Sequence, residues 1–463
     1  MGGSAFIDLF TPRMPPDIYN LILSQTLTTI QKHFTHVSSP IEAPGKADFG
    51  DIDILCHGPL TPPYNPSLTP KAKVTETIAK ELGAKSWIVG KSMQGMNLAI
   101  PWPDSHPDHS TSDENHETPG EGEGEGEGEE ERAGGEEERF IQLDIHIFTS
   151  LKQYNWELFH AAHGDLWNIL GSTIRRFGLT VNNLGLFLRI PDIELLDRKK
   201  SMVFLTDDST TILDFLGLDP ERWWCRFESQ DEMFEYAAGC RLFWIKEVME
   251  DGEGEGDVVG EIPIEGNRER ETNAGQEGGE AGKKKLKHND RQRMDKRPIF
   301  RTWIEDFIPK CREQGRFLEM RSSREQVRDE AFEKFGVREE FDTRLREWKL
   351  ERHKDEMWRG VIKGSVPTED VDPQFRAASV RFLRAVLMDG ELWEGSPLKE
   401  AERDGEGMWD LEAVRRFVEG NWEEAGRLGM VFQQKRALES MKAKAEKKAT
   451  LAGVEKVELK ALA

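Results

Sequence analysis

Two segments in the N-terminal third of the chain alternate apolar and polar side chains with the two-residue period of a β-strand. In residues 51–56, Asp51 and Asp53 lie on one face of the predicted strand, because successive strand side chains point to opposite faces. In residues 140–148, Asp144 lies on the polar face and the other face is aliphatic. If the two strands are neighbours, three carboxylates share one patch of the sheet surface.

Apolar periodicity divides the chain into an α+β part and an all-helical part. Helices are predicted over residues 15–34, 71–82, 154–177 and 206–218, and strands over residues 34–39, 51–56, 86–89, 96–102, 138–148, 184–190 and 201–205. From residue 299 the pattern is helical, with breaks at prolines. The sequence therefore predicts an α+β fold with a mixed sheet and helices, plus an all-α C-terminal region.

We expect five segments along the chain. They are the α+β domain (15–205), its helical extension rich in aromatic residues (206–245), a linker (246–298), an all-α region (299–436) and a charged helical tail (437–463). An insertion at residues 103–139 interrupts the first domain between two strands. The insertion and the linker contain Gly/Glu-rich runs that cannot bury much apolar surface, so we predict that both are disordered.

The formal net charge is −23, and much of it lies in those two acidic runs. The remaining chain is closer to neutral, which leaves RNA open as a partner. A basic run that begins at Lys283 is either a nuclear-import or RNA-contact tract or a counterpart that neutralises the acidic linker.

The four cysteines are far apart without metal-site spacing, which predicts reduced thiols in an intracellular protein. No apolar run approaches the roughly 20 residues that span a bilayer, and no signal-peptide pattern begins the chain. We therefore expect a cytoplasmic or nuclear protein that does not enter a membrane.

Three carboxylates on one patch indicate a cation site, because like charges at short range disfavour one another unless a cation lies between them. Carboxylate oxygens are the ligands that Mg²⁺ prefers, and two divalent ions about 3.5–4 Å apart are typical of phosphoryl transfer. By strand parity, His57 and His146 lie on the same face as the acids. They either add a ligand, which would favour Mn²⁺ or Zn²⁺, or line the site as ordinary polar residues.

An Asp-x-Asp strand, followed by a helix and a later strand with an apolar-Asp-apolar pattern, resembles the nucleotidyltransferase superfamily of the polymerase-beta type. The resemblance covers about residues 30–190, with a weaker similarity to about residue 245. It implies a palm-like mixed sheet. It also implies that Asp51 and Asp53 hold two Mg²⁺ (or Mn²⁺) ions and that Asp144 helps to activate the attacking hydroxyl.

The resemblance implies an enzyme that transfers a nucleoside monophosphate from an NTP to a hydroxyl acceptor, with RNA as a candidate acceptor. The family also carries a Gly-Ser pair on a turn shortly before the Asp-x-Asp. Here the corresponding segment contains Ser38 and Ser39, and the glycine is absent. The resemblance therefore assigns contact with the terminal phosphates to Ser38 or Ser39.

Other interpretations start from the same residues. Asp-x-Asp also marks glycosyltransferases that hold a sugar nucleotide through a metal, but those enzymes have a nucleotide-binding unit before the motif, and only 50 residues precede it here. A catalytically inactive nucleotidyltransferase-like module that binds RNA or a protein partner stays open, and the missing glycine favours it. The glycine-containing segment at residues 83–92 lacks the spacing of a phosphate loop, because Gly83 stands two positions too early.

Overall fold

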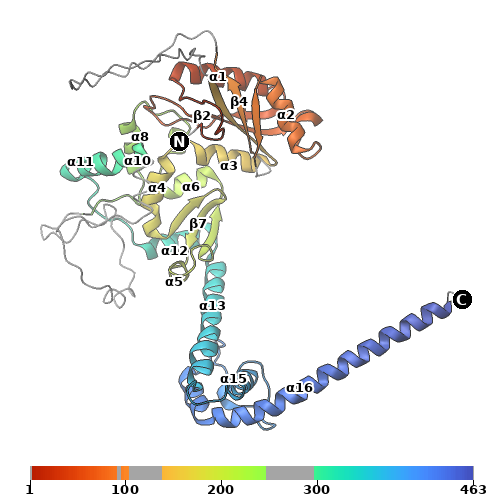
Figure 1. Ribbon diagram of the computed structural model, residues 1–463. Helices are drawn as coiled ribbons and strands as arrows, with labels where there is room; N and C mark the ends of the chain where they lie inside the picture. The colour runs from red at the N-terminus through yellow and green to blue at the C-terminus, as the bar shows by residue number, and fades with distance from the viewer. Residues whose placement is uncertain (1–2, 91–94, 104–137, 247–296, 462–463) are drawn as a thin grey trace, which may run out of the picture. The chain divides into compact units, whose positions relative to one another are not determined.

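The computed structural model describes residues 3–90, 95–103, 138–246 and 297–461, and the chain divides into two compact units, Met1–Val337 and Arg338–Ala463 (Figure 1). The predicted α+β class is confirmed, because the first unit contains a mixed five-stranded sheet and a three-stranded sheet, followed by a helical region. Most of the predicted insertion (103–139) and linker (246–298) lies outside the described residues. None of the described helices is both long and apolar enough to cross a membrane.

The five-stranded sheet carries the predicted aspartates. Its strands are β1 (Phe34–Ser38), β2 (Asp51–Pro59), β3 (Ser86–Val89), β4 (Gly95–Pro101) and β5 (Phe140–Phe148), in the order β1-β2-β5-β4-β3. The central neighbours β2 and β5 are parallel, and the other three pairs are antiparallel. A parallel pair needs a long crossover connection, which here includes α2 (Lys71–Glu81) and the β3–β4 hairpin.

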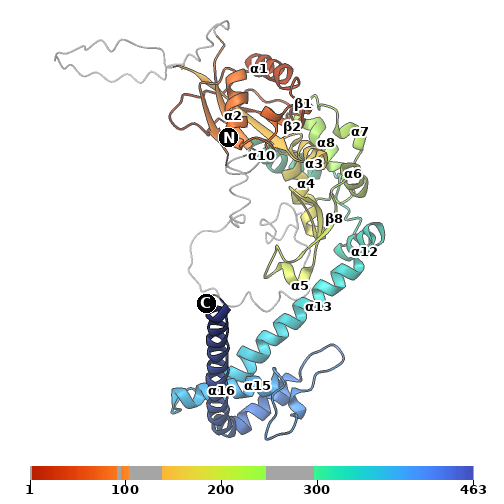
Figure 2. The ribbon, with the colours of Figure 1, turned by 90° about the vertical axis from the view of Figure 1, so that its right-hand side faces the viewer.

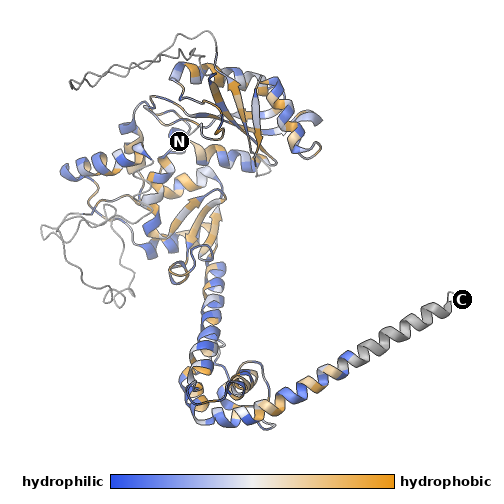
Figure 3. Ribbon diagram, in the orientation of Figure 1, coloured by the Kyte–Doolittle hydropathy of each residue, from blue (hydrophilic) through white to orange (hydrophobic). Residues whose placement is uncertain are grey.

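One face of this sheet forms the hydrophobic core of the domain. Ile52 and Ile54 of β2 and Ile145 of β5 are fully buried there, together with side chains of α1 (Pro16–Ile30) and α2. Figure 3 shows the hydrophobic residues concentrated on the strands. Burial of each such side chain contributes about 1.5–3 kcal/mol to the free energy of folding. Because the aspartates alternate with these isoleucines along β2, burying the isoleucines places the aspartates on the opposite face.

The opposite face of the sheet is polar in its middle and apolar at its two ends. At one end it packs against α3 (Leu151–Ala161), where Tyr154 contacts Leu55. At the other end the N-terminal segment crosses the sheet, and its Phe6 packs on Ala99. The polar middle therefore lies between the N-terminal segment and α3.

A second, antiparallel sheet follows the helices α4 (Leu166–Ile174) and η2 (Arg175–Phe177). Its strands are β6 (Leu179–Asn182), β7 (Gly185–Arg189) and β8 (Met202–Thr206) in sequential order, and α6 (Ser209–Leu216), α7 (Pro220–Trp223) and α8 (Gln230–Ala238) come after it. The sequence analysis assigned no strand to β6, because a four-residue alternation directly after a helix is too short to identify by period.

The helices directly after the linker belong to the first unit. They are α10 (Pro298–Thr302), η3 (Trp303–Phe307), α11 (Ile308–Glu313) and α12 (Arg324–Phe335). The indole of Trp303 packs on Phe234 of α8 and on Phe243, with ring centroids 5.5 and 5.1 Å apart. From the sequence this segment was predicted to belong with the C-terminal helices, because helical periodicity does not reveal which distant aromatic cluster a helix joins.

The second unit is built around the packing of α15 (Pro373–Leu387) against the first part of α16 (Leu411–Ala461), as Figure 2 shows. It also contains α13 (Arg338–Asp355), η4 (Glu356–Ile362), α14 (Lys363–Ser365) and η5 (Lys399–Ala401). The predicted charged tail, residues 437–463, falls in the C-terminal part of α16 as far as Ala461, where the described residues end.

A buried ion network ties α12 to the second sheet. Glu194 pairs with Arg189 of β7 at 3.0 Å and with Arg324 of α12 at 2.6 Å, and all three side chains are at most 10% exposed. Arg324 also lies against Gly178, whose φ of +79° places it in the left-handed region, and a Cβ there would approach the Arg324 Nε to 2.9 Å. Helix α12 therefore packs on the second sheet through the ion pair of Arg324 with Glu194 and through the close approach of Arg324 to Gly178.

We expect Glu194→Leu to lower the free energy of unfolding by about 3 kcal/mol, because it leaves two buried arginines without a counter-charge. Urea unfolding followed by tryptophan fluorescence measures the change. Asp48→Ala is the control, since it breaks an exposed pair with Arg13 and should cost at most about 1 kcal/mol. Equal effects of the two substitutions would show that the network does not hold α12.

Candidate functional site

The sheet register brings the three predicted aspartates together on the polar face. Asp53 of β2 is the direct partner of Asp144 on β5, and Asp51 is the partner of Gln142. Paired residues on neighbouring strands point to the same face, and the strands are about 4.8 Å apart. The three carboxylates therefore gather across the one parallel pair of the sheet, between α3 and the N-terminal segment.

The pKa values of two of these carboxyls are raised. Burial is the largest cause of the rise of the Asp53 pKa to about 7, followed by repulsion from Asp51 and then from Asp144. Burial also raises the pKa of Asp51, with repulsion from Asp144 as the next cause. The Asp53 residue is nevertheless exposed to solvent, so its burial is only partial. Crowded, partly desolvated acids of this kind are typical of functional sites.

A fourth carboxylate, which the sequence analysis missed, lies at the edge of the cluster. Glu42 belongs to the loop between β1 and β2 and contributes to the raised pKa values of Asp51 and Asp53. Its carboxylate accepts a hydrogen bond from the Tyr19 hydroxyl at 2.8 Å and pairs with Lys46. Lys46 lowers the pKa values of the same two aspartates, so it is a cation within electrostatic reach of the cluster.

Two side-chain amides bind one oxygen of Asp144. Asn97 Nδ2 donates to Asp144 Oδ1 at 2.6 Å, and Gln142 Nε2 donates to the same atom at 2.9 Å. Asn97 is the residue of β4 that stands opposite Asp144 in the register. It was recognisable in the sequence as a polar residue inside an otherwise apolar strand.

The structure separates the two predicted serines. Ser38 is the cross-strand partner of Leu55, so it shares the face of Asp53, and its hydroxyl interacts with that of Tyr154. Ser39 follows the strand, and its hydroxyl is buried next to that of Tyr19 without a hydrogen bond of standard geometry. Ser38 is therefore the serine on the same face as the acids, at the end of that face covered by α3.

The two histidines of this face lie in different settings. Burial lowers the pKa of His146, although the neighbouring Asp144 opposes that shift. His57 Nδ1 lies 3.0 Å from the backbone oxygen of Phe148. Among the described residues, no group of three or more His, Cys, Asp or Glu side chains, the three aspartates included, is arranged closely enough to hold a metal ion. The three aspartates nevertheless fit Mg²⁺ by the chemistry of their donors, which are oxygen anions that repel one another.

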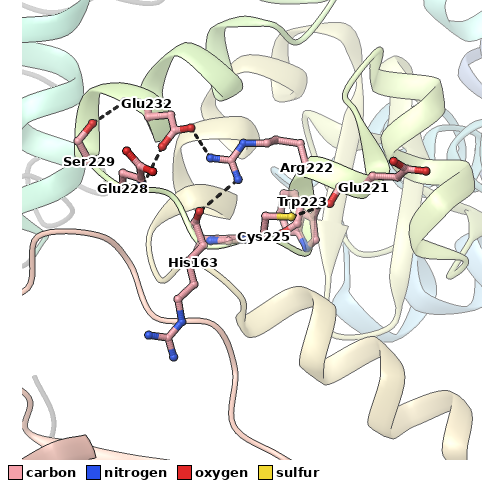
Figure 4. Close-up of polar contacts among 9 residues, drawn as sticks. His163, Glu221, Arg222, Trp223, Cys225, Glu228, Ser229 and Glu232 are labelled. Atoms are coloured by element: carbon pink, nitrogen blue, oxygen red, sulfur yellow. Dashed lines mark hydrogen bonds and ion pairs between the residues drawn. The ribbon is translucent and has the colours of Figure 1, made fainter.

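A buried histidine holds the loop that carries Glu42 and Lys46. The backbone N–H of His163 donates to the Ile41 oxygen at 2.6 Å, and its Nε2 lies 2.6 Å from the Trp223 oxygen. Figure 4 shows His163 beside the α7–α8 segment, where Arg222 pairs with Glu232. The site loop is thus fixed to the helical extension that follows the second sheet.

Comparisons with known proteins add no relative. A search of protein-family profiles finds none that matches the chain, and a search of curated proteins finds no match either.

A surface hollow of about 450 Å³ lies elsewhere in the first unit, against Phe215, Arg241 and Glu330. The acid cluster is the candidate site because the strand register brings three aspartates together and because the pKa values of two of them are raised.

We expect Asp53→Asn to stabilise the metal-free protein at pH 8 by about 1 kcal/mol, less than the full pKa shift implies because the residue is exposed to solvent. A carboxyl whose pKa is raised on folding binds more protons when folded, so stability falls as pH rises from about 4 to about 7. The gain should therefore vanish near pH 4. Thermal unfolding of both proteins across this range measures it, and a gain that does not depend on pH would contradict this electrostatic origin.

Proposed function

We propose that this chain is a metal-dependent nucleotidyltransferase that moves a nucleoside monophosphate from an NTP to a hydroxyl acceptor, with RNA as the first candidate acceptor. The observation that carries the proposal is the alignment of Asp53 with Asp144 on parallel strands, with Asp51 two residues away on the same face. This is the arrangement that the resemblance to the polymerase-beta type implies. The partial desolvation and raised pKa values of Asp51 and Asp53 further support a cation site.

In this proposal Asp51 and Asp53 hold Mg²⁺ or Mn²⁺, and Asp144 lies beside them next to the attacking hydroxyl. The bound ions would neutralise the triphosphate and lower the pKa of the acceptor hydroxyl. Asp144 would share one of the ions from the β5 side of the patch, the ion that lowers the pKa of this hydroxyl. The apolar packing of α3 and of the N-terminal segment limits water access at the two ends of the site.

Lys46 is the side chain best placed to meet the phosphates. It is a cation near Asp51 and Asp53, it is about one-third exposed, and it is paired with Glu42 across one turn of loop. A triphosphate can compete for Lys46 because phosphate oxygens bind an ammonium group strongly. In the family, the glycine of the Gly-Ser turn would help to bind the phosphates through its backbone, and that glycine is absent here. Lys46 therefore supplies positive charge in its place. Ser38 can add a hydroxyl.

One observation favours a second candidate function, a catalytically inactive nucleotidyltransferase-like module that binds RNA or a protein partner. Two amides already satisfy one oxygen of Asp144, so part of the acid cluster is stabilised by the protein itself. Within the described part of the chain the acids also form no group of three that could hold a metal ion. A site that no longer binds a metal ion would keep the hydrogen bonds from Asn97 and Gln142 to Asp144.

The first experiment is label transfer from each α-³²P-labelled NTP to a mixture of total RNA and protein, with Mg²⁺ or Mn²⁺. We expect label on the acceptor with the unmodified chain. The double substitution Asp51→Asn/Asp53→Asn should reduce transfer more than about 100-fold, since loss of even the outer partners of a metal site costs 10- to 100-fold. Asp48→Asn is the matched control, because Asp48 is exposed and pairs with Arg13 outside the cluster.

Nuclease and protease treatment of the product identify the acceptor. Transfer that persists in the double variant would overturn the assignment of Asp51 and Asp53. No transfer by folded protein with any NTP would favour the inactive module, and RNA pull-down would then test RNA binding.

We expect Lys46→Ala to raise the KM for the NTP about 10-fold with a smaller effect on kcat, because a charge-assisted bond to a phosphate contributes about 1.5 kcal/mol. Steady-state kinetics at saturating metal measures both constants. Lys73→Ala is the control, since Lys73 is exposed on α2 and pairs with Glu76. A KM that stays at the wild-type value would remove Lys46 from the phosphate site.

A further inference from the structure

The surroundings of Asp144 differ on its two sides. On the β4 side, Asn97 lies opposite Asp144 and donates to its Oδ1 at 2.6 Å. On the β2 side, Asp53 lies opposite and offers another carboxylate. Along β5, Gln142 stands two residues before Asp144 on the same face and donates to Oδ1 at 2.9 Å. Both amide hydrogen bonds therefore end on one oxygen, and the acidic neighbour lies on the other side.

The orientation of the Gln142 amide is fixed by the N-terminal segment. The backbone N–H of Ala5 donates to Gln142 Oε1 at 2.9 Å. A backbone N–H can only donate, so the amide oxygen must face Ala5 and the NH₂ group must face Asp144. Burial of Phe6 beside Ala5 and the close approach of Gly3 to the Gly50 oxygen hold this segment in place.

We propose that Asn97 and Gln142 are positioning residues that hold Asp144 Oδ1, so that Oδ2 is left to act as the single ligand atom of Asp144. The inference rests on the proposed function, since it assigns a purpose to the two amides only if the cluster binds a cation. Hydrogen bonds to the ligands of a metal site fix ligand orientation, and Mg²⁺ demands near-octahedral geometry. A carboxylate fixed by one oxygen cannot turn to bind through both.

The Ala5 contact extends this positioning to the N-terminal segment. The path runs from the Ala5 N–H through Gln142 to Asp144 Oδ1, and both of its hydrogen bonds are 2.9 Å long. Displacing the segment would free the Gln142 amide to rotate. The N-terminal residues therefore contribute to the geometry of the acid cluster without any acid of their own.

The test is binding of Mn²⁺ alone to the full chain, measured by the electron paramagnetic resonance signal of the free ion, with thermal unfolding in parallel. Asn97→Leu and Gln142→Met keep the approximate shape of each side chain and remove its N–H donors. We expect each variant to bind Mn²⁺ about 10-fold more weakly than wild type, and thermal unfolding to show that it is still cooperatively folded, with a lower melting temperature because a hydrogen bond to Asp144 is lost. Asn20→Leu is the matched control, because the Asn20 amide bonds the Pro16 oxygen on the surface of α1.

A second variant tests the path without touching the polar face. Gly3→Ala would place a Cβ 2.7 Å from the Gly50 oxygen and, at a φ of +81°, strain the segment that holds Gln142. We expect it to weaken Mn²⁺ binding in the same direction as Gln142→Met. Its effect should disappear in the Gly3→Ala/Gln142→Met double variant, because both changes act on the same amide.

The outcomes separate the inference from the proposed function. Wild-type protein that binds Mn²⁺, with Asn97→Leu and Gln142→Met binding equally well, would overturn the positioning role and leave the metal site standing. Wild-type protein that does not bind Mn²⁺ at all would overturn the metal site and the positioning role with it. Weaker binding by the two variants and unchanged binding by Asn20→Leu would support both.

Discussion

The parallel pairing of β2 with β5 is the constraint on which the candidate site depends. It places Asp53 opposite Asp144, although 90 positions separate them in the chain, and a slip of one residue would turn one of these side chains into the core. The buried isoleucines on the other face oppose such a slip, since exposing each would cost about 1.5–3 kcal/mol. The hydrophobic core therefore sets the geometry of the charged patch on the reverse of the sheet.

The acid cluster is held together at an electrostatic cost. Raised pKa values at Asp51 and Asp53 mean that their charged forms are disfavoured at neutral pH relative to free carboxyls. Lys46 offsets this repulsion from outside the cluster, and two amides stabilise Asp144 from within the sheet. A fold without use for the cluster would gain stability by replacing one of these acids with a neutral side chain, which is why the retained charge supports a role in binding a cation.

The alternation placed Asp51 and Asp53 on one face of their strand and Asp144 on the polar face of its own, because side-chain direction in a strand follows from position alone. That the two strands pair, and in which register, comes from the structure. Loop geometry was not predictable from the alternation, so Glu42 and Lys46 were missed. The alternation of side chains along the strand was not used to separate Ser38 from Ser39. The helices between the linker and Val337 were assigned to the wrong side of the division between the two units. Their place depends on aromatic packing with distant residues, and local period carries no information about such contacts.

The two candidate functions share the same backbone and differ at the free oxygen of Asp144. In an enzyme, the amides of Asn97 and Gln142 hold one oxygen of Asp144 so that the other oxygen can bind the metal ion. In a binding module, the same hydrogen bonds would only stabilise the partly buried carboxylate. The position of Asp53 distinguishes these cases physically. A second carboxylate opposite Asp144 raises the energy of the empty site and lowers that of a cation-bound one, and in a module without a cation only Lys46 and the two amides would offset that repulsion. The arrangement of the acids therefore favours cation binding, and with it the enzyme.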